Sequence, residues 1–154
     1  MLEAALATAV LGILASIALP KLSYMLDVSY VDYEIKCLHS MMHYTKSICR
    51  LALYNDFGFG PQSGYTRNTI ELRIKTADPD AYYVRKWDSS DRIKENRYIE
   101  RGFNLENYSV SGRIRFDFNG DFNPGENGRI LLLKNNLKRT LVLSGYGRAR
   151  IDRE

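Results

Sequence analysis

The sequence predicts an α+β protein in which a long N-terminal helix packs on an antiparallel β-sheet head. The first observation is an apolar run from Ala4 to Leu19, which an amphipathic helical pattern follows. The second is a series of short strand-like segments between turn signals, beginning near residue 69. With 154 residues the chain has room for one domain and an appendage, so we expect a membrane segment over 1–24 and a head over 25–154.

The apolar run is bounded by charge and by a helix breaker. Glu3 precedes it and Pro20 closes it. A membrane-spanning helix needs about 20 apolar residues, so the run is slightly short for one. A secretory signal peptide is an alternative, with Ser16-Ile17-Ala18 as its cleavage site, but its basic leading region is replaced here by a carboxylate. A buried core helix is a third alternative, although uniform apolarity without a polar face is unusual for one.

The same residues carry a family resemblance. Met1-Leu2-Glu3, followed by Leu11-Gly12-Ile13-Leu14-Ala15-Ser16-Ile17-Ala18-Leu19-Pro20, resembles the prepilin N-terminal segment of type IV pilins and type II secretion pseudopilins. That family has a basic leader ending in Gly, then Phe-Thr-Leu-Ile-Glu, then this apolar helix. The leader, its Gly and the Phe-Thr pair are missing here, so prepilin peptidase is an expected partner only if the native precursor carries a leader.

The resemblance implies a pilin-like fold and a role in assembly. We expect a single-pass protein of the bacterial inner membrane, with its head in the periplasm and its final place in a cell-surface filament. The partners are then other pilins or pseudopilins. Glu3 and Pro20 are the residues that the family uses in filament assembly, where the carboxylate faces the N-terminal amine of a neighbouring subunit. That pairing would offset the cost of placing a charge at the edge of hydrocarbon.

An amphipathic helix is expected from about 28 to 54. Its apolar face recurs at spacings of three and four residues and comprises Val31, Ile35, Leu38, Met42, Thr45, Cys49 and Ala52. The breakers in 55–61 end the helix. Cys37 and Cys49 would lie about 18 Å apart on it, too far for a disulfide, so we interpret them as packing residues.

The rest of the chain reads as a β-rich region over 69–151. The expected strands are Thr69–Thr76, Ala81–Trp87, Arg97–Phe103, Tyr108–Phe118, Gly128–Lys134 and Thr140–Ile151, the last bent at 145–147. Strict alternation in 113–118 places Ile114, Phe116 and Phe118 inward. Asn119-Gly120 then favours a hairpin turn.

The C-terminal region has a charge signature of its own. Residues 134–154 hold six basic and two acidic residues, which equals the net charge of +4 for the whole chain. An anionic partner is therefore expected to bind there. Arg148 and Arg150 share one strand face, where they can contact successive phosphates, and Tyr146 can stack on an unpaired base.

This region also resembles a known family. The Gly-Arg-Ile-Leu-Leu-Leu strand and the closing segment 141–151 are similar to the C-terminal half of the GspH/FimT family. Gly147-Arg148-Ala149-Arg150 resembles the Gly-Arg-x-Arg tail of FimT-type minor pilins, which bind DNA during natural transformation. Gly112-Arg113-Ile114-Arg115 is a second copy, so four arginines would share one surface if the two strands are neighbours. Lys138 and Arg139 complete the predicted DNA-binding set. The alternative is outward arginines without a ligand, in a minor pseudopilin of a type II secretion system that acts without DNA.

Two further clusters favour structural interpretations. Oxygen ligands gather in one turn at Asp117, Asn119, Asp121, Asn123 and Glu126. Phe122 and Gly128 stand where a calcium loop needs Gly and Glu, so a polar hairpin turn is favoured. His39 and His43 lie one helical turn apart, but no third ligand is evident, which favours surface histidines over a metal site. No nucleophile–base arrangement and no phosphate-binding loop appear, so we expect no metal, no cofactor and no enzymatic activity.

Overall fold

The computed structural model describes residues 2–51, 70–76, 80–86, 92–99, 103–107, 113–116, 122–123, 128–134 and 136–153. One helix, α1 (Leu2–Leu51), is followed by nine described strands. The strands are β1 (Ile70–Lys75), β2 (Ala81–Lys86), β3 (Arg92–Tyr98), β4 (Asn104–Asn107), β5 (Arg113–Phe116), β6 (Phe122–Asn123), β7 (Gly128–Lys134), β8 (Leu137–Leu143) and β9 (Ala149–Arg153). The α+β fold with a long N-terminal helix on antiparallel sheets confirms the predicted fold class.

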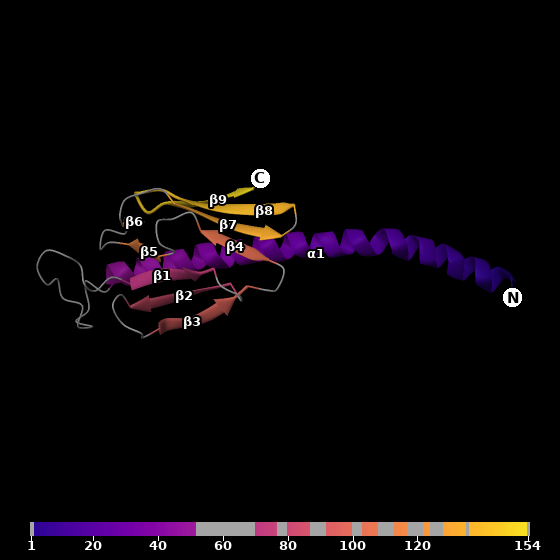
Figure 1. Ribbon diagram of the computed structural model, residues 1–154, viewed down its shortest axis with the longest axis horizontal. Coiled ribbons are helices and arrows are strands. Elements are labelled where there is room, and N and C mark those ends of the chain that lie inside the picture. Colours follow the sequence, from indigo (N-terminus) through magenta and orange to yellow (C-terminus); the bar gives the residue numbers. More distant parts are fainter. Residues whose placement is uncertain are drawn as a thin grey trace, which may run out of the picture.

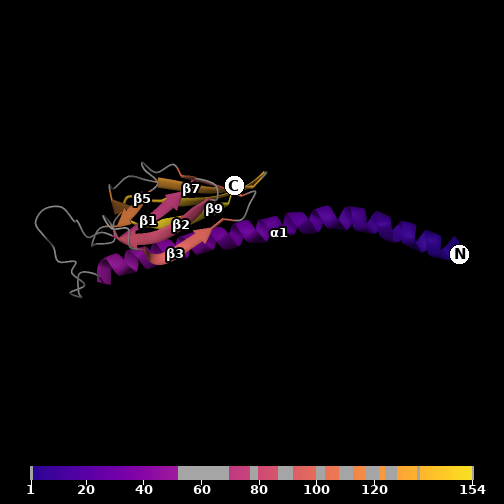
Figure 2. The same ribbon diagram turned by 60° about the horizontal axis from the view of Figure 1, so that its bottom comes forward.

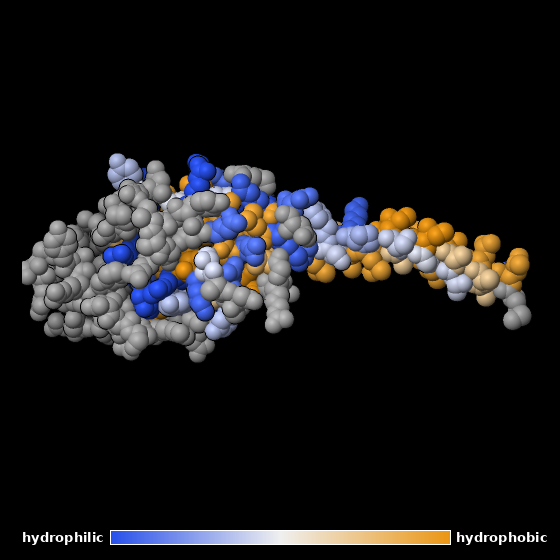
Figure 3. All heavy atoms as spheres, viewed as in Figure 1, coloured by the Kyte–Doolittle hydropathy of each residue, from blue (hydrophilic) through white to orange (hydrophobic). Residues whose placement is uncertain are grey.

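The C-terminal half of helix α1 packs in the head, whereas its N-terminal half is exposed. Its 50 residues span about 75 Å at roughly 1.5 Å per residue. The N-terminal half projects from the head and is covered by apolar side chains (Figures 1 and 3). Every described side chain up to Leu26 is exposed, and the first fully buried one is Val31. By length and composition this helix could cross a membrane.

Pro20 lies inside α1 rather than at its end. Proline has no N–H to donate, so the carbonyl of Ser16, four residues earlier, loses its helical partner. The helix nevertheless continues to Leu51, and its ribbon curves gently over the projecting half (Figures 1 and 2). The predicted helix from 28 to 54 is therefore the second half of one continuous helix, and residues 52–54 lie outside the described part.

The strands form two antiparallel sheets against the same helix. Sheet A has the order β3-β2-β1-β5-β6, and sheet B has the order β4-β7-β8-β9. Most strands that are hydrogen-bonded to each other are also consecutive along the chain. Both sheets lie on the C-terminal half of α1 (Figures 1 and 2). The helix contacts sheet A mainly through β1, and sheet B mainly through β8.

One stripe of α1 supplies the centre of the core. The buried helix residues are Val31, Glu34, Ile35, Leu38, Met41, Met42, Thr45 and Cys49. Leu72, Ile114 and Phe116 of sheet A and Ile130, Leu141 and Leu143 of sheet B cover this stripe. The predicted packing face is confirmed, and so are the inward Ile114 and Phe116. Ala52 and Phe118 lie outside the described residues. Cys37 and Cys49 form no disulfide with each other, and Cys49 is buried as a packing residue.

A carboxylate stands within this otherwise apolar stripe. Glu34 is only 4% exposed, and it accepts hydrogen bonds from Arg97 Nε at 2.9 Å and from Tyr82 Oη at 3.2 Å. The second Arg97 contact, from Nη2 to Oε1, is 2.5 Å long, so the pair is bidentate. Burial and the neighbouring carboxylate raise the pKa of Tyr82, which keeps its hydroxyl protonated as a donor. The network joins α1 to β2 and β3 of sheet A.

Two strand predictions are wrong in their boundaries. The expected strand Arg97–Phe103 is replaced by β3, which ends at Tyr98, and by β4, which begins at Asn104. Because β3 is an edge strand, it lacks the apolar alternation that identifies a strand from sequence. Ile99 and Phe103 are buried between the two strands, where the chain passes from one sheet to the other.

The last expected strand is two strands. Thr140–Ile151 is divided between β8 and β9, which pair antiparallel from Arg139↔Arg153 to Leu143↔Ala149. The predicted bend is thus a complete reversal of the chain. The predicted hairpin turn at 119–120 lies outside the described residues, although β5 and β6 on either side of it are paired.

A pair of leucine truncations on α1 tests this arrangement. Leu38→Ala removes a side chain that is 1% exposed, whereas Leu51→Ala removes one that is 58% exposed. We expect the first to lower the free energy of unfolding by about 2–5 kcal/mol, since it leaves a cavity. The second should change it by less than about 0.5 kcal/mol. Denaturant unfolding of the full-length chain in detergent measures both, and equal losses would contradict the packing face.

Candidate nucleic-acid interface

The C-terminal hairpin positions the candidate arginines. Gly147 N donates to Ser144 O at 2.9 Å, and Ser144 N donates to Arg148 O at 2.9 Å. Gly147 has a φ of 68°, which glycine adopts without strain. This is a three-residue loop in which a turn is followed by a left-handed residue. The loop brings Arg148 opposite Ser144 and starts β9 with Arg150 in a defined register.

Three arginines gather on the outer face of sheet B. Arg129 of β7 pairs in register with Val142 of β8, and Val142 pairs with Arg150 of β9. Residues opposite each other on neighbouring strands share a face, so Arg129 and Arg150 lie two strands apart, roughly 10 Å. Arg148, two residues before Arg150, is also exposed.

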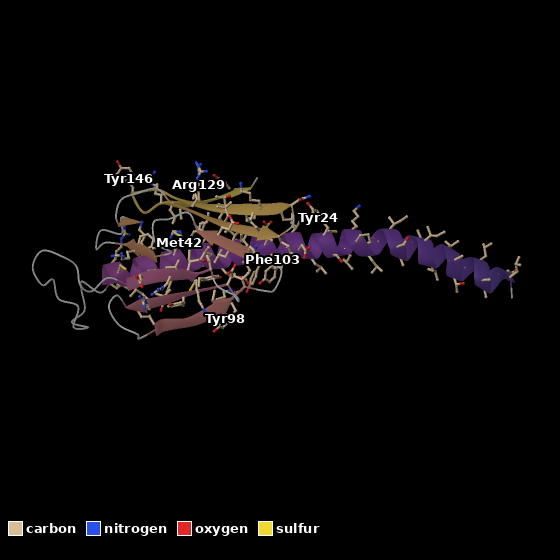
Figure 4. The ribbon with its side chains drawn as sticks, in the orientation of Figure 1. Tyr24, Met42, Tyr98, Phe103, Arg129 and Tyr146 are labelled. Atoms are coloured by element: carbon tan, nitrogen blue, oxygen red, sulfur yellow. The ribbon has the colours of Figure 1, made fainter. Side chains whose placement is uncertain are left out.

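Tyr146 lies at the turn beside these arginines and is 82% exposed. Figure 4 shows Tyr146 and Arg129 projecting from the same side of the head, above sheet B. Sequence reasoning missed Arg129 because it is one basic residue in an apolar strand. The sequence carried no clear signal, since Ile130, Leu131 and Leu132 are all buried and the strand does not alternate. We name Arg129, Arg148, Arg150 and Tyr146 the outer basic surface.

Other basic residues of the C-terminal region face the helix instead. Arg139 Nε donates to Asp32 at 2.6 Å, and the Arg139 side chain is 12% exposed. Lys134 Nζ donates to Asp27 at 2.5 Å and lies 4.1 Å from the centre of the Phe103 ring. Odd-numbered positions of β8 face inward with Leu141 and Leu143. The charge of Arg139 is therefore matched within the head, and its place in the predicted DNA-binding set stays a prediction.

One acidic residue, Asp152, lies beside the outer basic surface. Arg150 makes an ion pair with Asp152 at 3.2 Å, and the Arg150 side chain is 74% exposed. Such exposed pairs contribute about 1 kcal/mol or less, so a phosphate can replace the carboxylate. Lys138 lies on the outer face of β8, four residues along the strand from Val142, the residue that stands between Arg129 and Arg150. Within the described part of the chain, neither Arg129 nor Arg148 forms an ion pair.

The second Gly-Arg-x-Arg segment lies in a different sheet. Arg113 and Arg115 are in β5, which pairs with β1 of sheet A, whereas Arg148 and Arg150 are at β9 of sheet B. Arg115 stands opposite the buried Glu71 in the strand register, and Glu71 accepts a hydrogen bond from Arg85 Nε at 2.5 Å. The two Gly-Arg-x-Arg segments were expected to share one surface only if their strands were neighbours, and they are not neighbours. The four arginines therefore form no single strand-pair surface.

The remaining candidates are placed as follows. Glu3 is exposed in the first turn of α1, where a carboxylate interacts favourably with the helix dipole. His39 and His43 are on the exposed side of α1, and their Nε2 atoms are 3.3 Å apart. Asn123 is in β6, while the other residues of the predicted polar turn lie outside the described part. No group of three or more His, Cys, Asp or Glu gathers among the described residues.

The long helix, half exposed and half packed on antiparallel sheets, defines the fold of the type IV pilins. Two crystal structures of the type IV minor pilin FimU from Pseudomonas aeruginosa strain PAO1 share it. One aligns with a TM-score of 0.59 at 13% identity, over 79% of this chain and 87% of that chain. The other has a TM-score of 0.55 at 14% identity, over 76% and 88%. At this identity the likeness establishes the fold alone.

Sequence comparison adds no family assignment. No family model matches the chain, and no curated protein matches it significantly. The resemblance to the GspH/FimT family therefore stays a prediction from the quoted residues, while the pilin-like fold is established.

Neutralising one inward and one outward arginine separates their roles. Arg139→Gln should lower the free energy of unfolding by about 1–2 kcal/mol, because Asp32 loses a partly buried partner. Arg148→Gln, an exposed change of the same chemistry, should alter it by less than about 0.5 kcal/mol. Denaturant midpoints of the two full-length variants measure this. A larger loss for Arg148→Gln would contradict the inward assignment of Arg139.

Proposed function

We propose that this chain is a non-catalytic minor subunit of a type IV pilus or a related bacterial filament. Residues 1–24 anchor it in the inner membrane, and residues 25–154 form a periplasmic head. The observation that carries the proposal is the projecting half of α1, whose apolar side chains from Leu2 to Leu26 are exposed. Such a surface is stable only in lipid or against other apolar helices. A filament core of packed helices provides the second environment.

The head of this subunit binds DNA without sequence preference through the outer basic surface. Three cations stand on one face, and a phosphate backbone attracts them whatever the base sequence. Tyr146 at the turn can stack on a base of a single strand or a frayed end. Arg113, Arg115 and Arg139 are left out of this surface, since they lie in another sheet or face the helix. Lys138 is a peripheral member.

A specific observation supports the alternative function. The ion pairs of Lys134 and Arg139 with α1, and of Arg150 with Asp152, match much of the C-terminal positive charge within the head. A head balanced in this way suits contacts with other proteins. In the alternative, the chain is a minor pseudopilin of a type II secretion system, and its head contacts other pseudopilins or cargo without DNA.

Filament assembly is tested at Glu3. We expect Glu3→Ala to abolish incorporation into filaments without unfolding the head, because a paired carboxylate matters only in the apolar helix bundle. Cross-linking to partner pilins in the native host measures incorporation, and the circular dichroism of the purified variant reports the fold. Lys36→Ala, an exposed change on the head part of α1, is the control. Normal assembly of Glu3→Ala would show that the carboxylate has no such role.

DNA binding is tested with the charges of the outer basic surface. Each phosphate contact on duplex DNA contributes a slope of about −0.9 to the plot of log affinity against log salt. Replacing Arg129, Arg148 and Arg150 together by Gln should reduce the slope by about 2.7, and Arg129→Gln alone by about 0.9. Labelled duplexes of two unrelated sequences, titrated with the full-length protein in neutral detergent at three salt concentrations, give these slopes.

Lys75→Gln is the matched control, since Lys75 is an exposed cation on sheet A. It should leave both affinity and slope unchanged. If the triple variant binds like the parent, the outer basic surface is not the DNA site. If the parent binds no DNA at low salt, the secretion pseudopilin is the better assignment.

A further inference from the structure

Two imidazoles lie side by side on α1, away from every contact used above. His39 is half-buried and His43 is exposed, and four residues of helix place them on one face. Their Nε2 atoms are 3.3 Å apart, and their rings meet edge to face with centroids at 4.5 Å. In this contact the Nε2–H of one ring donates a hydrogen bond to the Nε2 of the other. If both rings were imidazolium cations, no acceptor nitrogen would remain and the contact would be lost.

The separation matches that of two nitrogen ligands on one metal ion. Zinc binds histidine nitrogen at about 2.0–2.1 Å with tetrahedral angles, which puts two such nitrogens about 3.3–3.4 Å apart. The Nε2 atoms of His39 and His43 are already at that separation. For both lone pairs to face one ion, the rings must turn from their edge-to-face contact, and rotation about Cβ–Cγ is a broad torsion for histidine.

We propose that His39 and His43 form a two-imidazole binding site for a borderline divalent transition metal ion, of which Zn²⁺ is the probe. No third ligand joins them among the described residues, so water completes the coordination. Imidazole selects zinc, nickel and copper over the hard cations magnesium and calcium. The site shares no residue with the outer basic surface, and the proposal does not rest on the filament role.

The electrostatic surroundings of His43 favour its neutral form, but they also limit the affinity for a metal ion. Burial, the neighbouring His39 and the Lys46 ammonium group lower the pKa of His43 below its ordinary value. The lowered pKa favours the neutral ring, which is the form of histidine that binds a metal ion. Lys46 Nζ donates to Gly147 O at 3.0 Å, which holds its charge at the hairpin turn of sheet B. That charge repels a divalent ion, so a tight structural zinc centre is not expected.

Binding should stabilise the part of α1 that carries the head. A chelate across one helical turn links residues 39 and 43, which flank the buried Met41 and Met42. Metal that binds the folded state alone raises the apparent stability as its concentration rises. Acidification should reverse the effect, since protons compete for the same nitrogen atoms.

The experiment uses the untagged full-length chain in neutral detergent. The chain contains two histidines, so imidazole ¹⁵N NMR reports on this pair alone. Adding Zn²⁺ at pH 7.5 should shift the signals of both rings with one common Kd, and Ca²⁺ should shift neither. At pH 5.5 the Zn²⁺ affinity should fall at least tenfold.

Variants separate the chelate from other binding. His39→Ala and His43→Ala should each raise the Kd for Zn²⁺ at least tenfold. Cys37→Ser removes the half-buried thiol nearby on the same helix and should leave the Kd unchanged. Circular dichroism verifies that the three variants stay folded. The proposal is overturned if neither ring responds to millimolar Zn²⁺, if one ring responds alone, or if either histidine variant binds like the parent.

Discussion

The whole head depends on one buried stripe of one helix. Two sheets that share no hydrogen-bonded strand pair among those described meet on the same side chains of α1, from Val31 to Cys49. Burying each large apolar side chain contributes about 1.5–3 kcal/mol, so the stripe is the main favourable term joining the sheets. Each sheet depends on the helix to cover its inner face. Ile114 of sheet A and Ile130 of sheet B are both at 0% exposure, in the same core cluster as the helix stripe.

Polar contacts on both sides of the stripe fix how each sheet is oriented. On one side Glu34 holds Arg97 and Tyr82 of sheet A. On the other side Asp27 and Asp32 hold Lys134 and Arg139 of sheet B. Apolar burial is not directional, whereas a bidentate carboxylate–guanidinium pair demands one geometry. The acidic residues of α1 therefore set the register between helix and sheets, while the apolar residues provide the free energy.

This internal pairing also explains why the net charge of the C-terminal region does not show which of its cations face outward. The C-terminal excess of positive charge is real, but Lys134 and Arg139 are matched by aspartates more than 100 positions earlier in the chain. What projects outward is a smaller set, which includes Arg129 from outside that region. A polyanion is attracted by cations that share one face of the folded protein. The net charge of a segment does not show which of its cations share a face.

The sequence by itself determined the helix, its exposed apolar half, its packing stripe and the α+β class. Those features follow from the local hydrophobic periodicity and from the lengths of the apolar segments, which do not depend on contacts with residues far away in the sequence. It also determined the strand β7 and the inward Ile114 and Phe116.

Tertiary structure decided the rest. It divided Thr140–Ile151 into β8 and β9 through the left-handed Gly147, and it placed the two arginine pairs in different sheets. It also turned Arg139 inward and brought Arg129 beside Arg150. Strand pairing and ion pairs join residues far apart along the chain, and a local pattern carries no record of its distant partner.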